Sequence, residues 1–301
     1  MADITVIGSN MIDLMTYIDR MPEEGETISA PSFSMGFGGK GSNQAIAASR
    51  LGSDVAMITA VGADEFGQQQ LDNYQENGIK TDMIIHGKAN SGVAPIFVEP
   101  TSGNRIIIVK GANDELTPDA LDQFKSQIQS SKLIVLQQEI PLETNYRAIE
   151  IARAANVPVL LNPAPAVEGI NREFVNQVQF YAPNETELST ITGMPVESID
   201  EIKAAAHKLI DEGVENLIVT IGSRGVLWVC KDDFKLIDAH KVDAVDTTGA
   251  GDSFIGAFAH YYVAGESVSE ALQHANDYAA VTVTRKGTQK SYPTAAELKN
   301  L

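Results

Sequence analysis

The sequence has 301 residues, enough for one large domain, and its 44% apolar and 21% charged content is that of an ordinary globular protein. A formal net charge of −18 argues against nucleic acid or an anionic membrane as partner, because both require a basic surface. The one cysteine, Cys230, excludes an internal disulfide and provides no zinc site; its apolar, strand-like surroundings predict a buried thiol.

The N-terminal segment reads as a strand with an acid at Asp3, and not as a secretion signal. No apolar run reaches the length of a membrane span. We therefore expect a cytoplasmic protein.

Strand-like and helix-like patterns alternate along the chain. The strand-like runs cover residues 4–8, 55–61, 133–137, 157–165, 179–184 and 216–222. The helical patterns cover residues 40–52, 67–79, 142–157 and 198–214, each closed near Gly or Pro. This order predicts an α/β fold with a mostly parallel sheet between two layers of helices.

Two stretches, residues 11–38 and 92–111, are strand-like without intervening helices, and PTSGNR (100–105) has the composition of a hairpin turn. We predict that they form a small β-sheet that projects from the edge of the main sheet as a lid. The main domain then comprises residues 1–10, 39–91 and 112–301.

The glycine-rich segment GFGGKG (36–41) matches the dinucleotide pattern G-x-G-x-x-G formally. The preceding strand belongs to the lid, however, and no acid follows at the expected distance. A Walker phosphate loop is absent, because Lys40 is followed by Gly41 and not by Ser or Thr. A nicotinamide dehydrogenase is also disfavoured, because the segment after the first strand lacks the glycine fingerprint of such enzymes.

A second glycine-rich segment, DAVDTTGAGDSFIGAF (243–258), opens an apolar helix. The amides of Gly249, Ala250, Gly251 and Asp252 can form an anion cradle there, with the glycines making room for a phosphate. Asp252 then lies beside the anion and can take a proton from an attacking hydroxyl. A tightly turned, capped helix start without a ligand explains this segment alone equally well.

Several segments together resemble the ribokinase (PfkB) family of sugar kinases, in its ribokinase or deoxyribokinase branch. They are GFGGKGSNQAIAASRLG (36–52), NPAPA (162–166), PNETE (183–187), TIGSRG (220–225), DTTGAGDSF (246–254) and TRKGTQKSYP (284–293). The resemblance implies a transfer of the γ-phosphoryl group of ATP to the 5-hydroxyl of D-ribose or 2-deoxy-D-ribose. It also implies a lid that forms a homodimer contact. One alternative is another sugar or nucleoside kinase of the family, fructokinase-like or adenosine kinase-like. A second alternative is a non-catalytic sugar or nucleotide sensor on the same fold.

The resemblance also implies roles for individual residues. Asp252 is similar to the family's catalytic base, and its anion hole corresponds to Gly249, Ala250 and Gly251. The residues similar to the sugar-binding ones are Asp13, Gly39, Lys40, Asn43 and Glu139. Taken alone, these would read as turn, surface or strand-end residues.

On the nucleotide side, Asn184 and Glu187 resemble the pair that organises water around Mg²⁺, and their spacing is also that of a helix cap. The nucleotide contacts implied by the resemblance are Asn184, Thr220, Gly222, Ser223, Gly225, Gly251 and Asn276. The implied potassium site comprises Asp246, Thr248, Thr282, Arg285, Gly287 and Ser291, mostly through their carbonyls.

One position departs from the family pattern. Ribokinases typically read Gly-Ser-x-Asn-x-Asp where this chain reads GSNMID (8–13), which places Met11 at the sugar-facing Asn. Because side chains alternate along a strand, Met11 should share the face of Asp13 while Asn10 points away. A thioether bonds a hydroxyl poorly, so we expect 2-deoxyribose to be favoured relative to ribose.

Overall fold

The computed structural model describes residues 2–99, 104–167 and 169–299. The α/β prediction is confirmed: one large sheet has the strand order β13-β12-β11-β10-β9-β8-β1-β4-β5. Neighbouring strands from β11 to β5 pair in parallel, whereas β12 and β13 are antiparallel additions at one edge. The strands of this sheet are β1 (Ile4–Ile7), β4 (Val55–Val61), β5 (Ile84–His86), β8 (Leu133–Leu136), β9 (Val159–Leu161), β10 (Phe180–Tyr181), β11 (Asn216–Thr220), β12 (Val226–Cys230) and β13 (Phe234–Ile237).

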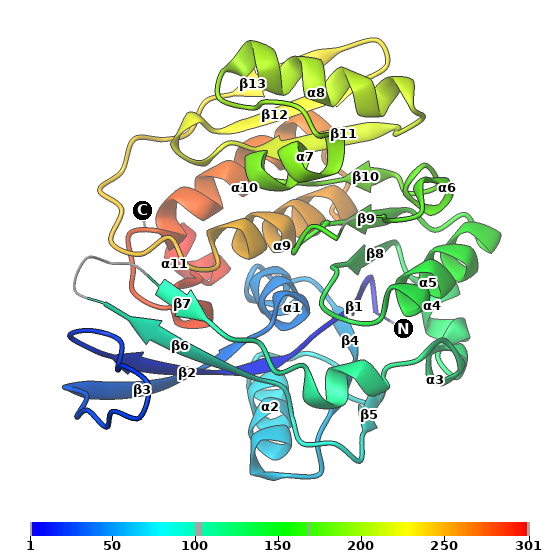
Figure 1. Ribbon diagram of the computed structural model, residues 1–301. Helices are drawn as coiled ribbons and strands as arrows, with labels where there is room; N and C mark the ends of the chain where they lie inside the picture. Colours follow the sequence, from blue (N-terminus) through cyan, green and yellow to red (C-terminus); the bar gives the residue numbers. More distant parts are fainter. Residues whose placement is uncertain (1, 100–103, 168, 300–301) are drawn as a thin grey trace.

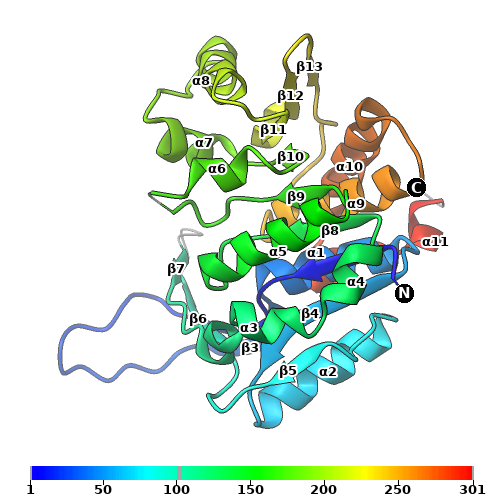
Figure 2. The same cartoon turned by 90° about the vertical axis from the view of Figure 1, so that its right-hand side faces the viewer.

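Helices cover both faces of the sheet (Figures 1 and 2). One face carries α1 (Lys40–Arg50), α2 (Glu65–Glu76), α9 (Ala250–Val263), α10 (Val268–Thr282) and α11 (Ala295–Leu298). The other carries α3 (Pro118–Asp122), α4 (Lys125–Ser130), α5 (Leu142–Ala154), α6 (Arg172–Val175), α7 (Glu185–Thr192) and α8 (Ile199–Asp211).

The alternation of side chains in the central strands divides the core into two layers. In β8, Leu133 and Val135 pack under α1 and α9, whereas Ile134 and Leu136 pack under α5 on the opposite face. All four are fully buried, and burying each such side chain contributes roughly 1.5–3 kcal/mol. A strand buried on both faces therefore needs the continuous apolar run that the sequence shows.

A second sheet, here called the lid sheet, has the order β3-β2-β6-β7. Its strands are β2 (Met11–Tyr17), β3 (Ser32–Gly38), β6 (Val93–Val98) and β7 (Asn104–Ile106). The β6–β7 hairpin has the predicted antiparallel pairing, and residues 100–103 of its turn lie outside the described residues. We predicted that the lid sheet projects from the edge of the main sheet, but β2 continues from the inner strand β1, so the lid sheet rises over the carboxyl ends of the strands (Figure 2).

Among residues 2–99, 104–167 and 169–299, no helix combines the length and apolar character that crossing a membrane requires.

Candidate active site

Successive parallel strands end in polar residues at one edge of the main sheet, below the lid sheet. Glu139 follows β8, Asn162 follows β9, Asn184 follows β10, and Thr220 is the last residue of β11. The carboxyl ends of parallel strands are the usual position of ligand sites in such folds. The start of α9 lies at the same edge and completes the site (Figure 1).

Two adjoining cavities occupy this edge. The acceptor cavity, of about 350 Å³, lies under the lid sheet and is lined by Met11, Asp13, Gly39, Lys40, Asn43, Ala94, Ile96, Ile106, Ile108, Glu139, Pro165, Thr248, Gly249, Asp252 and Thr288. The donor cavity, of about 180 Å³, is lined by Lys40, Asn162, Ala164, Ala182, Asn184, Glu187, Thr220, Thr247, Gly249, Ala250, Gly251, Asp252 and Ile255. Lys40, Gly249 and Asp252 border both, so a group moving from one cavity to the other passes these three residues.

The start of α9 gives its two glycines different roles. Gly249 has φ of 75°, and a Cβ there would lie 2.5 Å from Thr288 Cγ2 and 2.6 Å from Tyr292 Oη. Gly249 is therefore required by its backbone and its packing, not by room for a ligand as we predicted. A Cβ at Gly251, the second residue of α9, would meet nothing within 4 Å, so of the two glycines only Gly251 leaves open space beside the helix start.

The predicted anion cradle is also incomplete in one respect. The amide of Ala250 donates to the carbonyl of Thr247 at 3.2 Å and closes a turn. We predicted that this amide would instead donate to a bound phosphate. The amides of Gly251 and Asp252 remain at the helix start, where the positive end of the helix dipole favours an anion.

Asp252 is 8% exposed and lies where the cavities meet. Asn43 Nδ2 donates to its Oδ2 at 2.9 Å, and Gln44 Nε2 donates to its Oδ1 at 3.0 Å. Each carboxylate oxygen thus has one amide donor and keeps further lone pairs for a proton. Such a carboxylate can act as a general base for a hydroxyl in the acceptor cavity.

Two further carboxylates border the acceptor cavity. Glu139 Oε2 accepts from Ser9 Oγ at 2.5 Å and from the Lys40 amide at 2.9 Å. Burial, then the charges of Glu139 and Asp252, raise the pKa of Asp13 to about 7. Taken alone, Glu139 would read as a strand-end residue, and the structure buries it.

Lys40 is the cation of the site. Burial alone would lower the pKa of its ammonium, but the carboxylates of Asp252, Glu139 and Glu187 outweigh burial and raise that pKa. Lys40 therefore stays charged at the junction of the two cavities. A half-buried cation there can neutralise charge on a group transferred between them.

The raised pKa of Asp13 predicts that its carboxylate destabilises the ligand-free protein above neutral pH. In the folded protein the group is protonated up to about pH 7, and in the unfolded chain only up to its ordinary value of 3.8. The free energy of unfolding of the wild type should therefore fall as pH rises from 4 to 7, since the unfolded chain binds fewer protons there. For Asp13→Asn, the Tm without ligands should exceed that of the wild type at pH 8 by more than at pH 5. An equal difference at both pH values would contradict the shift.

Met11 and Asn10 point in opposite directions, as the strand alternation predicts. Met11 is 2% exposed, borders the acceptor cavity and packs with Ala94 and Ile96 of β6. Asn10 Nδ2 instead donates to the Ala60 carbonyl at 2.8 Å in the interior. The wall of the acceptor cavity beside Asp13 is therefore apolar.

Gly39 borders the acceptor cavity, but its close contact is with the chain itself. It has φ of 86°, and a Cβ there would lie 2.6 Å from Asn10 Cα and 2.8 Å from the Met11 amide nitrogen. The resemblance implies a sugar contact at Gly39, and the structure shows a separate need for a glycine here. Its lack of a side chain lets α1 start directly against the β1–β2 junction.

On the donor side, Asn184 and Glu187 form the predicted capping box of α7: Asn184 Oδ1 accepts from the Glu187 amide, and Glu187 Oε2 accepts from the Asn184 amide, both at 2.8 Å. Both residues border the donor cavity. Burial raises the pKa of Glu187, although the Asn184 amide and Lys40 oppose this effect. Glu187 Oε1 accepts no hydrogen bond from the described residues. This carboxylate oxygen could therefore accept a hydrogen bond from a water molecule of a hydrated Mg²⁺.

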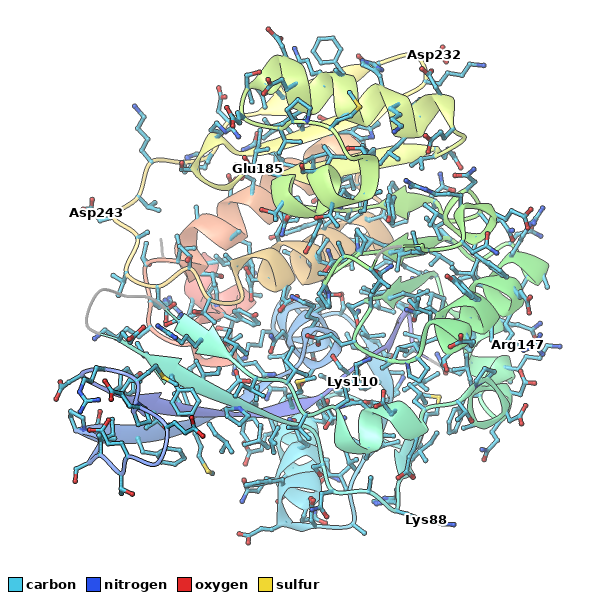
Figure 3. The ribbon with its side chains drawn as sticks, viewed as in Figure 1. Lys88, Lys110, Arg147, Glu185, Asp232 and Asp243 are labelled. Atoms are coloured by element: carbon cyan, nitrogen blue, oxygen red, sulfur yellow. The ribbon has the colours of Figure 1, made fainter. Side chains whose placement is uncertain are left out.

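The other predicted nucleotide residues lie farther along the same side. Thr220 borders the donor cavity, whereas Gly222, Ser223, Gly225 and Asn276 border neither cavity. Asn276 Nδ2 donates to the Asp238 carbonyl at 2.9 Å. An ion pair between Arg224 and Glu185, which Figure 3 labels at the start of α7, ties the 222–225 loop to that helix.

The six residues of the predicted potassium site belong to two segments that Asp246 holds together. Asp246 Oδ1 accepts from the Thr248 amide at 3.0 Å, and Oδ2 accepts from the Gly287 amide at 2.9 Å. Arg285 Nη1 donates to Glu297 Oε1 at 3.1 Å. The hydroxyls of Thr282 and Ser291 donate to the Tyr278 and Thr288 carbonyls. Hydrogen bonds thus already engage the side chains of Asp246, Thr282, Arg285 and Ser291, so main-chain carbonyls of these segments are the more available ligands for a cation.

Sequence reasoning missed several polar residues that line the site or hydrogen-bond to residues of the site: Ser9, Gln44, Asn162, Thr247, Thr288 and Gln289. Two of them carried a usable signal. Gln44 directly follows Asn43 in the first glycine-rich segment, and Asn162 opens NPAPA at the end of a predicted strand. Gln289 gave no local signal, because its partners are 216 to 247 residues away.

Comparisons with known proteins show the family of the chain. Residues 1–295 match the model of the pfkB family carbohydrate kinases. A deoxyribokinase of Salmonella typhi is 50% identical over 292 residues, 97% of this chain and 95% of that protein. A ribokinase of Mus musculus is 38% identical over 99% of this chain and 94% of its own length.

Among solved structures, the ribokinase of Arabidopsis thaliana complexed with ribose and ATP has a TM-score of 0.92 and 32% identity, covering 99% of this chain and 98% of that one. The chain therefore belongs to the pfkB family of carbohydrate kinases.

Proposed function

We propose that this chain transfers the γ-phosphoryl group of ATP to the 5-hydroxyl of 2-deoxy-D-ribose, with D-ribose as a second acceptor. The similarity to a deoxyribokinase and to ribokinases supports the pentose as substrate class. The observation that carries the choice of pentose is Met11, which presents a thioether to the acceptor cavity beside Asp13.

In this proposal the pentose occupies the acceptor cavity and the phosphates of ATP occupy the donor cavity. Asp252 accepts the proton of the 5-hydroxyl as the phosphoryl group moves, and Lys40 and the start of α9 neutralise the charge that develops. Positioning and charge neutralisation supply most of the acceleration in phosphoryl transfer. Mg²⁺ held through water by Asn184 and Glu187 would add charge neutralisation at the phosphates.

We further propose that K⁺ binds the main-chain carbonyls of the 246–248 and 282–291 segments and sets the geometry of the adjacent anion site. The lid sheet is proposed to close over the pentose and to form a homodimer contact, because the face opposite Met11 carries exposed Phe33 and Met35. A cytoplasmic location stays a prediction.

The proposal for Met11 predicts the relative rates on the two pentoses. Ribose differs from 2-deoxyribose by one hydroxyl, and a hydroxyl left without a partner against Met11 costs about 1–3 kcal/mol. We expect kcat/KM for 2-deoxyribose to equal or exceed that for ribose, and Met11→Asn to shift the ratio toward ribose by about tenfold.

Steady-state kinetics with both sugars measure this ratio. Met35→Asn is the matched control, since Met35 pairs with Leu14 on the opposite face of the lid sheet and is 41% exposed. A wild-type preference for ribose of about tenfold or more would rule out the role of Met11. A shift caused equally by Met35→Asn would show that the effect is not local.

A further inference from the structure

Two chains of buried side-chain amides converge on Asp252, one on each carboxylate oxygen. In the first, Asn73 Nδ2 donates to Gln289 Oε1 at 3.0 Å, and Gln289 Nε2 donates to Asn43 Oδ1 at 2.9 Å and to Ser42 Oγ at 3.0 Å. Asn43 Nδ2 then donates to Asp252 Oδ2 at 2.9 Å. Donors and acceptors alternate along the whole chain, so each amide orients the next.

In the second chain, Gln137 Nε2 donates to Gln44 Oε1 at 2.7 Å. Gln44 Nε2 donates to Asp252 Oδ1 at 3.0 Å and to Asn162 Oδ1 at 3.1 Å. Asn162 is in turn oriented by its own donation to the Ala182 carbonyl at 2.8 Å. Both chains therefore present nitrogen, never oxygen, to Asp252.

The orientation of these amides is fixed by burial and by their outer partners. Gln44 is 1% exposed, Gln289 is 5% exposed and Gln137 is fully buried, so water cannot readily replace a lost partner. Rotating the Gln289 amide by half a turn would set its NH₂ against the Asn73 donor. A residue such as Gln289, which touches neither cavity, can thus decide which atom Asn43 turns toward Asp252.

We propose that Gln44 and Gln289 are positioning residues that keep the Asp252 carboxylate charged and aimed at the acceptor hydroxyl. This inference rests on the proposed function, in which Asp252 is the general base. Hydrogen bonds donated to a carboxylate favour its charged form. Each amide removed therefore lets the protonated, inactive form of Asp252 persist to higher pH.

Five other charged or titratable groups lie around Asp252. They are Asp13 on β2, Lys40 on α1, Glu139 after β8, Glu187 on α7 and Tyr292 before α11. Substitutions at Gln44 or Gln289 leave all five in place and change no formal charge. A change in the pH profile of the variants thus reports the lost amide.

The test measures kcat against pH, with pentose and ATP saturating, for the wild type, Gln44→Met and Gln289→Met. We expect the acidic limb of the kcat–pH profile to move to higher pH in both variants and kcat at neutral pH to fall severalfold, with KM for ATP within about twofold. Gln127→Met is the matched control, because its half-buried amide donates to the Ala2 carbonyl and Thr5 Oγ1, away from the site. Its acidic limb should coincide with that of the wild type.

Folded variants whose acidic limbs coincide with the wild type would overturn the proposal. The Asp252→Asn variant tests the proposed function separately. If it kept a normal kcat and the acidic limb of its kcat–pH profile, Asp252 would not be the base, and the proposed function would be wrong. Should either variant fail to fold, the wild type itself supplies the second measurement. The side-chain NH₂ signals of Asn43 and Gln44 in NMR spectra should titrate with the midpoint of the kcat limb, and signals constant across it would refute the role.

Discussion

Replacing Asp252 by Asn is expected to lower kcat by at least about 10²-fold and to leave KM for pentose and for ATP within a few-fold. The amide keeps the size of the side chain but cannot accept the proton of the 5-hydroxyl, and general bases typically contribute 10²–10⁴-fold. Steady-state kinetics at saturating concentrations of both substrates measure the loss.

The hydrogen bonds around Asp252 require a second variant as control. Asn43 and Gln44 each donate to one of its oxygens, so the NH₂ group of an asparagine would face one of these donors. Asp252→Ala removes the base without that conflict and should lose kcat at least as strongly. Near-normal kcat in either variant would contradict the assignment of Asp252 as base.

Gly251→Ala and Gly249→Ala are expected to fail for opposite reasons. A methyl at Gly251 enters open space at the donor cavity, where the proposed phosphate lies, so kcat/KM for ATP should fall about 10²-fold in a protein as stable as the wild type. A methyl at Gly249 meets Thr288 and Tyr292 within 2.6 Å, on a backbone with φ of 75°. Gly249→Ala should therefore lower the Tm by several degrees, since strain of about 1–3 kcal/mol is expected there.

Thermal unfolding without ligands and ATP kinetics separate the two effects. If Gly251→Ala were destabilised and Gly249→Ala were not, the roles assigned to the glycines would be reversed. If Gly251→Ala kept its kcat/KM for ATP, the start of α9 would not hold the phosphate. Pentose affinity measured without nucleotide should change little in Gly251→Ala, because Gly251 does not border the acceptor cavity.

The sequence was informative wherever a signal is local. The alternation of side chains along residues 10–13 correctly predicted that Met11 shares the face of Asp13, at the acceptor cavity, while Asn10 points into the interior, because the direction of each side chain depends on one short segment. The spacing of Asn184 and Glu187 correctly predicted a capping box, since the cap lies within one helical turn. The buried strands were recognisable for a similar reason: their apolar runs are continuous.

Features that depend on distant segments could not be predicted in this way. Gly249 is required partly by Thr288 and Tyr292, which approach it only once α9 and the 284–293 segment have packed. The raised pKa of Asp13 needs Glu139 and Asp252 beside it, and 113 residues separate Asp252 from Glu139 in the sequence. The amide chains through Gln44 and Gln289 likewise exist only after α1, α2, α9, the 284–293 segment and the residues that follow β8 and β9 have come together.

The central claim is that a pentose 5-hydroxyl and the γ-phosphate of ATP meet at Asp252, between the acceptor and donor cavities. Proton-coupled ³¹P NMR of the product formed from 2-deoxy-D-ribose and Mg·ATP tests it most directly. A phosphate ester on C5 couples to two methylene protons, so we predict a triplet that grows in step with ADP. A doublet, which marks a phosphate on a CH carbon of the ring, or release of inorganic phosphate alone would contradict the account.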